Sequence, residues 1–197
     1  MNGNITALDL WTQAWDLILA GADSGDHPFG LTYVASVGGQ GVPRQRTVVL
    51  RSADRKLAEL RTYTDRRSIK AHELKANNLV SYLFWDPDTR IQFSGHGPTH
   101  WLPRAEAREV FNQLPKHGRK AYATQQPPST PLERADDGLP PDWAELSQQQ
   151  TDYAVANFGV LVTRIQYADV LRLDREQNLR LTASRSGNDW TLRWIVP

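Results

Sequence analysis

The chain has 197 residues, and its 23 Lys and Arg nearly balance its 22 Asp and Glu, which leaves a net charge of +1. This balance gives no strong global attraction to nucleic acid or to an anionic membrane, so we expect neither as a partner. The chain has no cysteine, which excludes disulfides, thiolate nucleophiles and iron–sulfur clusters. No apolar run approaches the ~20 residues that span a bilayer, no signal-peptide pattern opens the chain, and we expect a cytoplasmic location.

The first predicted element is an amphipathic helix. Thr6 is placed to cap it, and Asp9, three residues later, is placed to complete a capping box. Apolar side chains then fall on one helical face: Leu8, Trp11, Trp15, Ile18 and Leu19. The helix should end near Gly21, and we expect it to pack on a sheet.

Short strands separated by turns make up most of the remaining chain. Period-two alternation and β-branched or aromatic residues predict strands in these segments: 31–36, 46–52, 60–63, 79–85, 90–96, 158–167, 171–174, 178–184 and 190–195. Ser68 is placed to cap a short helix that ends at Asn77, and Pro103 is placed to begin another. Short antiparallel strands with a few outer helices indicate a mainly β fold with flanking helices, closed or nearly closed into a barrel.

Residues 123–142 are rich in proline and polar side chains. We interpret them as an extended surface loop or lid within a single domain spanning 1–197, and not as a domain boundary. A short helix is predicted to follow at 143–150.

The segment from Arg46 to Lys70 places cations and a helix start close together along a strand, a turn and a helix. Arg46 can form a two-pronged contact with a phosphate. Lys70 lies in the first turn after Ser68, so that an ammonium, free backbone N–H groups and the helix dipole would meet at one point. Residues 47–49 would offer backbone groups to the edge of a flat ring. We interpret this combination as a site for flavin mononucleotide (FMN).

Five motifs follow one another between Arg46 and Gly95: Arg-Thr-Val-Val-Leu-Arg, Tyr-Thr, Ser-x-Lys, Leu-Val-Ser-Tyr-Leu-Phe-Trp and Arg-x-Gln-x-x-Gly. In this order they resemble the pyridoxamine 5'-phosphate oxidase-like, FMN-binding split-barrel family, and the similarity extends from the first helix to Pro197. The resemblance implies a six-stranded antiparallel split β-barrel of Greek-key type. It also implies a homodimer with FMN at the subunit interface. The implied activity is that of an oxidoreductase that transfers hydride between a small organic substrate and the flavin.

The resemblance also implies a set of cofactor contacts: Arg46, Thr47, Val48, Val49, Arg51, Tyr63, Thr64, Arg67, Ser68, Lys70, Arg90, Gln92 and Arg180. Ile69 stands where the family usually has an arginine, and Arg67 would supply that charge from the preceding loop. Counting back from Gly95 favours Arg90 against the flavin ring, whereas residue type favours Gln92, so both remain candidates.

The expected substrate side departs from the family pattern. Glu176 and Asn178 stand where the vitamin-converting members have an Arg-x-His pair, and Gln126 aligns with a family arginine. Arg51, in place of the usual lysine, and Tyr122 remain as substrate contacts. We therefore expect a substrate other than pyridoxamine phosphate.

Other functions remain open at this point. The chain could be a non-catalytic FMN-binding or sensing module, or a split barrel that binds haem or a deazaflavin. Haem would need His96 or His100 as its axial ligand. We predict no metal site, because these histidines lack a carboxylate at fixed spacing.

Overall fold

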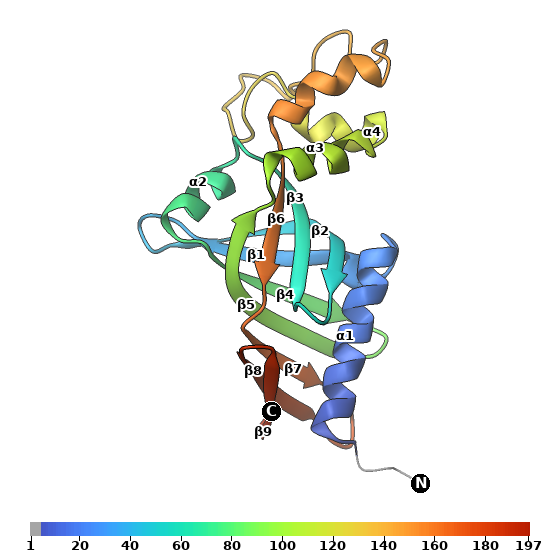
Figure 1. The fold of residues 1–197 in the computed structure, drawn as a ribbon, viewed down its shortest axis with the longest axis vertical. Helices are drawn as coiled ribbons and strands as arrows, with labels where there is room; N and C mark the ends of the chain where they lie inside the picture. The colour runs from blue at the N-terminus through green and yellow to red at the C-terminus, as the bar shows by residue number, and fades with distance from the viewer. Residues whose placement is uncertain (1–4) are drawn as a thin grey trace.

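Residues 5–197, which the computed structural model describes, form nine strands in one continuous antiparallel sheet. The strands are β1 (Leu31–Val37), β2 (Pro43–Asp54), β3 (Glu59–Asp65), β4 (Leu79–Asp86), β5 (Ile91–Trp101), β6 (Phe158–Arg164), β7 (Tyr167–Arg172), β8 (Leu179–Ser186) and β9 (Asp189–Ile195). Six of them, in the order β4-β1-β2-β3-β6-β5, close into a barrel because β4 also pairs with β5. Strands β7, β8 and β9 continue the sheet away from the barrel (Figure 1). The predicted six-stranded antiparallel barrel with flanking helices is confirmed.

The barrel splits along β5, because this strand changes its partner partway. Its first half, Ile91–His96, pairs with β7, and its last residues, Thr99–Trp101, pair with β6. Gly97 lies between the two halves, and a Cβ atom there would collide with the carbonyl group of Arg164. Glycine therefore permits the close approach of the two backbones where the sheet divides.

Helix α1 (Ala7–Asp23) lies against the barrel (Figure 1). The Thr6 hydroxyl accepts a hydrogen bond from the Asp9 amide at 3.1 Å, and the Asp9 carboxylate accepts one from the Thr6 amide at 2.9 Å. The predicted capping box is thus present, and such a cap contributes about 1 kcal/mol. Trp15 and Ile18 are fully buried in the main core, as the helical periodicity predicted. Leu8, which was predicted on the same face, is instead 63% exposed.

The remaining helices, apart from the short η1 that precedes β1, lie near the end of the barrel that is opposite β7–β9 (Figure 1). They are η1 (Pro28–Gly30), α2 (Ile69–Ala76), α3 (Arg104–Asn112), α4 (Lys116–Arg119), η2 (Lys120–Tyr122) and η3 (Gln149–Ala156). A second core cluster joins this end to the barrel through Phe111, Tyr122 and Phe158. Within the described range, no helix is both long and apolar enough to cross a bilayer.

Three local predictions were wrong. The strand predicted at 171–174 is not a separate strand, because Leu171 and Arg172 are the last residues of β7 and residues 173–174 lie outside any strand. The helix predicted at 143–150 is instead a series of turns followed by η3, a 3-10 helix. The strand predicted over 158–167 is broken between β6 and β7, because the Gln166 amide donates to the His96 carbonyl of β5. Residues 123–142 contain neither helix nor strand.

Candidate functional site

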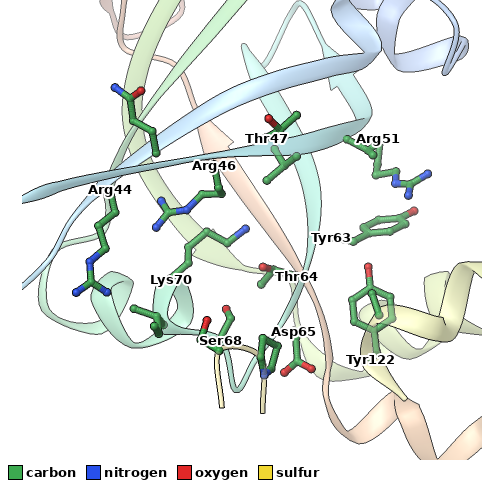
Figure 2. A pocket seen from close by; sticks show the side chains of 17 residues that line it. Arg44, Arg46, Thr47, Arg51, Tyr63, Thr64, Asp65, Ser68, Lys70 and Tyr122 are labelled. Carbon is green, nitrogen blue, oxygen red and sulfur yellow. The ribbon is translucent and has the colours of Figure 1, made fainter. Parts of the chain in front are cut away.

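A cavity of about 720 Å³ lies between β2, β3, the start of α2, η2 and the loop 123–142. The structure brings most of the predicted site residues together here (Figure 2). They are Arg46, Thr47, Val48, Val49, Arg51, Tyr63, Thr64, Ser68, Lys70 and Tyr122. Figure 2 shows Arg44, Arg46 and Lys70 at one end of the cavity and Arg51, Tyr63 and Tyr122 at the other.

The cationic end combines strand β2 with the start of α2. Arg44 and Arg46 are two residues apart on β2, so that their side chains lie on the same face of the strand. Ser68 caps α2 by accepting a hydrogen bond from the Ala71 amide at 3.3 Å. Lys70, in the first turn of this helix, leaves only 8% of its surface exposed. Three cations therefore border one end of a single cavity.

The Lys70 ammonium has no hydrogen-bond or ion-pair partner among residues 5–197. Burial lowers its pKa from 10.5 to about 8, and the nearby Arg46 guanidinium acts in the same direction. A buried cation is costly unless an anion compensates it. Lys70 therefore lacks a compensating negative charge, which a bound anion would supply.

Sequence reasoning missed Glu73, the acidic residue behind this cationic end. Its Oε2 atom accepts hydrogen bonds from Arg46 at 3.2 Å and from the Ser36 hydroxyl at 2.5 Å. Arg44 Nη1 lies 3.3 Å from Oε1. Because Glu73 follows Lys70 by three residues on α2, helical spacing alone could have placed it on the same face.

The other end of the cavity carries two phenols and one guanidinium. The Arg51 guanidinium lies 5.2 Å from the centroid of the Tyr63 ring. Burial raises the pKa of both the Tyr63 and Tyr122 hydroxyls, although Arg51 opposes the shift. Both phenols are therefore neutral at physiological pH and can donate hydrogen bonds.

Arg67 does not line the cavity. Its guanidinium forms an ion pair with Asp65 at 2.7 Å and donates to the Thr124 carbonyl at 3.0 Å. The structure therefore does not support a phosphate contact from Arg67 in this conformation. It shows instead an arginine that anchors the start of the loop 123–142.

The remaining predicted cofactor contacts also lie outside this cavity. Gln92 on β5 pairs with Leu171 on β7, which in turn pairs with Arg180 on β8. Arg180 is held by Asp169 through an ion pair of 3.0 Å. Arg90, in the preceding turn with φ of 54°, lines a second cavity of about 1020 Å³ together with Arg180. One chain alone does not bring these three residues to the first cavity.

An open sheet face connects the two regions. It is formed by side chains that share one side of the sheet according to the strand register: Thr47, Val49, Leu31, Tyr33, Leu83, Trp85, Gln92 and Arg180. Its apolar members are unusually exposed, with 53% for Leu31 and Tyr33 and 38% for Trp85. Since Thr47 and Val49 also line the first cavity, this face is continuous with it.

The two histidines considered for haem or metal both lie on β5. The His96 ring stacks on Tyr167 at a centroid distance of 5.1 Å. Over the described residues, no group of three or more His, Cys, Asp or Glu side chains is placed to hold a metal ion.

Comparison with solved structures defines the class of fold. A pyridoxamine 5'-phosphate oxidase-related, FMN-binding protein from Nostoc punctiforme superposes with a TM-score of 0.74 at 22% identity, covering 95% of this chain and 97% of the other. PhzG from Burkholderia lata, solved with tetrahydrophenazine-1-carboxylic acid, gives a TM-score of 0.67 at 18% identity, covering 96% and 90%. The chain thus has the split-barrel fold of these proteins.

Sequence comparison shows which family part of the chain resembles. The family model for the FMN-binding domain of pyridoxamine 5'-phosphate oxidase matches residues 10–102. A pyridoxine/pyridoxamine 5'-phosphate oxidase of Anaeromyxobacter dehalogenans is 32% identical over 118 residues, which are 59% of this chain and 58% of that relative. The match thus spans a little over half of the relative's length. The predicted resemblance to the pyridoxamine 5'-phosphate oxidase-like, FMN-binding proteins is confirmed.

Proposed function

We propose that the first cavity binds FMN and that the protein is an FMN-dependent oxidoreductase. The observation that carries this proposal is the largely buried Lys70 side chain, whose ammonium has no anionic partner within residues 5–197. Arg44, Arg46 and Lys70 carry three positive charges, and Glu73 carries one negative charge, which leaves a net charge of +2. The phosphate of FMN, with roughly two negative charges, balances it.

The fit extends beyond the phosphate. Thr47, Val48 and Val49 border the cavity next to the cationic end and would offer backbone groups to the pyrimidine edge of the flavin. Tyr63 and Thr64 line the cavity from the neighbouring strand, β3. When bound, FMN supplies the hydride-accepting ring, and the protein supplies binding, orientation and electrostatics.

A homodimer would complete the site. The open sheet face exposes aromatic side chains such as Tyr33 and Trp85 on the same side of the sheet as Thr47 and Val49, which line the cavity. Patches of this kind commonly mark interfaces. A second copy packed on this face would bring its Gln92 and Arg180 near the flavin. We favour Gln92 over Arg90 as the ring contact, because Gln92 lies on this face and Arg90 lies in a turn.

The substrate would bind at the end of the cavity formed by Arg51, Tyr63 and Tyr122. This end offers one guanidinium and two neutral hydroxyls, which suits a small organic substrate with at most a single negative charge. Glu176 and Asn178 line the second cavity, in place of the Arg-x-His pair of the vitamin-converting members. These features support a substrate other than pyridoxamine phosphate.

Titration of the cofactor-free protein with FMN and with riboflavin, which lacks the phosphate, tests the proposal. We expect FMN to bind with a Kd below ~10 μM and riboflavin to bind at least about tenfold more weakly. Saturable binding of haemin with no binding of either flavin would instead support the haem alternative. Anaerobic mixing of the FMN complex with pyridine nucleotides and a panel of organic donors then tests catalysis. Bleaching of the flavin followed by turnover is expected, whereas a flavin that no donor reduces would support a non-catalytic binding module.

A further inference from the structure

Glu73 is a buried carboxylate surrounded by the cations of the candidate phosphate site. Only 7% of its surface is exposed. One of its oxygens accepts from Arg46 and Ser36 at 3.2 and 2.5 Å, and the other lies 3.3 Å from Arg44. That second oxygen receives no hydrogen bond of good geometry among the described residues. Glu73 therefore neutralises the same arginines that would bind an incoming phosphate.

Arg46 does not depend on Glu73 alone for its position. Its guanidinium also donates to the Ser36 hydroxyl at 2.5 Å and approaches the Val34 carbonyl at 3.5 Å. Neutralising Glu73 would thus leave Arg46 partly held in place. The main effect would be electrostatic: Arg44 and Arg46 would lose their shared anion, and a bound phosphate would lose a repelling neighbour.

We propose that Glu73 is a built-in counter-anion that stabilises the empty phosphate site and, in doing so, lowers the affinity of that site for the cofactor phosphate. This inference rests on the proposed function, because it takes FMN as the ligand. Two anions that neutralise the same cations oppose each other, and this coupling is reciprocal. Glu73 would thus favour a stable cofactor-free protein at the expense of tight FMN retention.

The chain contains a matched control in Glu59. This glutamate is equally buried, with 6% of its surface exposed. It also faces two arginines, Arg164 at 2.9 Å and Arg61 at 3.8 Å. The arginines that Glu59 contacts, Arg61 and Arg164, do not line the candidate cavity, whereas Arg44 and Arg46, which Glu73 contacts, do. Neutralising Glu59 should therefore affect folding stability without affecting phosphate recognition.

The test compares the wild-type protein with Glu73→Gln and Glu59→Gln. Titrations with FMN, riboflavin and inorganic phosphate give affinities, and thermal unfolding gives Tm without ligand and with saturating FMN. We expect Glu73→Gln to bind FMN and inorganic phosphate about tenfold more tightly than wild type, with riboflavin affinity unchanged. Without ligand its Tm should fall by about 3–6 °C, and saturating FMN should remove most of that difference. Glu59→Gln should lower Tm with and without FMN and leave all three affinities unchanged.

Unchanged or weaker FMN binding by Glu73→Gln would overturn the inference, as would an equal change for FMN and riboflavin. If Glu73→Gln does not fold, Arg44→Gln is compared with the double variant Arg44→Gln/Glu73→Gln, which keeps the wild-type net charge. The double variant should bind FMN more tightly than the single variant, and the opposite order refutes the inference.

Wild-type protein that binds inorganic phosphate but not FMN would refute the proposed function alone, because the Glu73 comparison can still be made with phosphate. Binding of neither would refute both.

Discussion

Lys70 should make FMN binding depend on pH. Burial and Arg46 hold the pKa of its ammonium at about 8 in the cofactor-free protein. A bound phosphate favours the charged form, so that the pKa in the complex should return to its ordinary value of about 10.4 or above. As the pH rises through 8, the free protein loses this proton while the complex keeps it. FMN affinity is therefore full below pH 8 and falls above it.

The size of the effect follows from the two pKa values. With about 8 in the free protein and about 10.4 in the complex, FMN should bind about tenfold more weakly at pH 9 than at pH 7, a loss of about 1.4 kcal/mol. The phosphate itself, with a second pKa of about 6, remains doubly charged over this range. The change of FMN affinity with pH therefore reports the titration of Lys70 and not that of the phosphate.

The assay is a fluorescence titration with FMN at pH 7, 8 and 9, with riboflavin as the ligand control. Lys70→Arg, whose guanidinium stays charged throughout, should bind FMN with little pH dependence. Lys70→Met should bind weakly at all three values. A wild-type FMN affinity that is constant from pH 7 to 9 would show that Lys70 does not hold the phosphate, and so would an equal pH dependence for riboflavin.

Three further variants test other parts of the account. Arg46→Ala should weaken FMN binding by roughly ten- to a hundredfold with little effect on riboflavin, and equal losses for both ligands in titration would contradict a phosphate contact. Trp85→Lys places a charge on the open sheet face and should convert a dimer into monomers in analytical ultracentrifugation while weakening FMN binding; an intact dimer with unchanged affinity would argue against this interface. Arg67→Ala removes the bonds that hold Thr124 and should lower the free energy of unfolding by about 1–3 kcal/mol. It should also speed limited proteolysis within 123–142, and cleavage at the wild-type rate would show that Arg67 does not anchor this loop.

Local sequence signals predicted most of the fold. The capping pair Thr6 and Asp9 fixed the start of α1, because a cap depends only on residues three apart. Period-two alternation of apolar and polar residues predicted the barrel strands, because one face of each strand is buried. Two of the three cations at the cationic end were predicted for the same reason: Arg46 is on a strand that local pattern identifies, and Lys70 follows Ser68 at a helix start that local pattern also identifies. Arg44, which also lines the cavity, was not predicted.

Interactions between distant segments account for what the sequence did not predict. The break between β6 and β7 arises from the bond between Gln166 and β5, which no local pattern encodes. The partner of Arg67 is Thr124, fifty-seven residues away, so that its pairing could not be predicted from the motif Arg67-Ser68. The role of Glu73 depends on β2 lying beside α2, which only the folded barrel establishes.

A crystal structure of the protein with FMN bound would show whether two chains share the cofactor site. The account predicts two chains related by a twofold axis, with the FMN phosphate within hydrogen-bond distance of Arg46 and Lys70 of one chain. It also predicts the flavin ring between β2 of that chain and the open sheet face of the other. A phosphate bound elsewhere, with the Lys70 ammonium still lacking an anion, would contradict it.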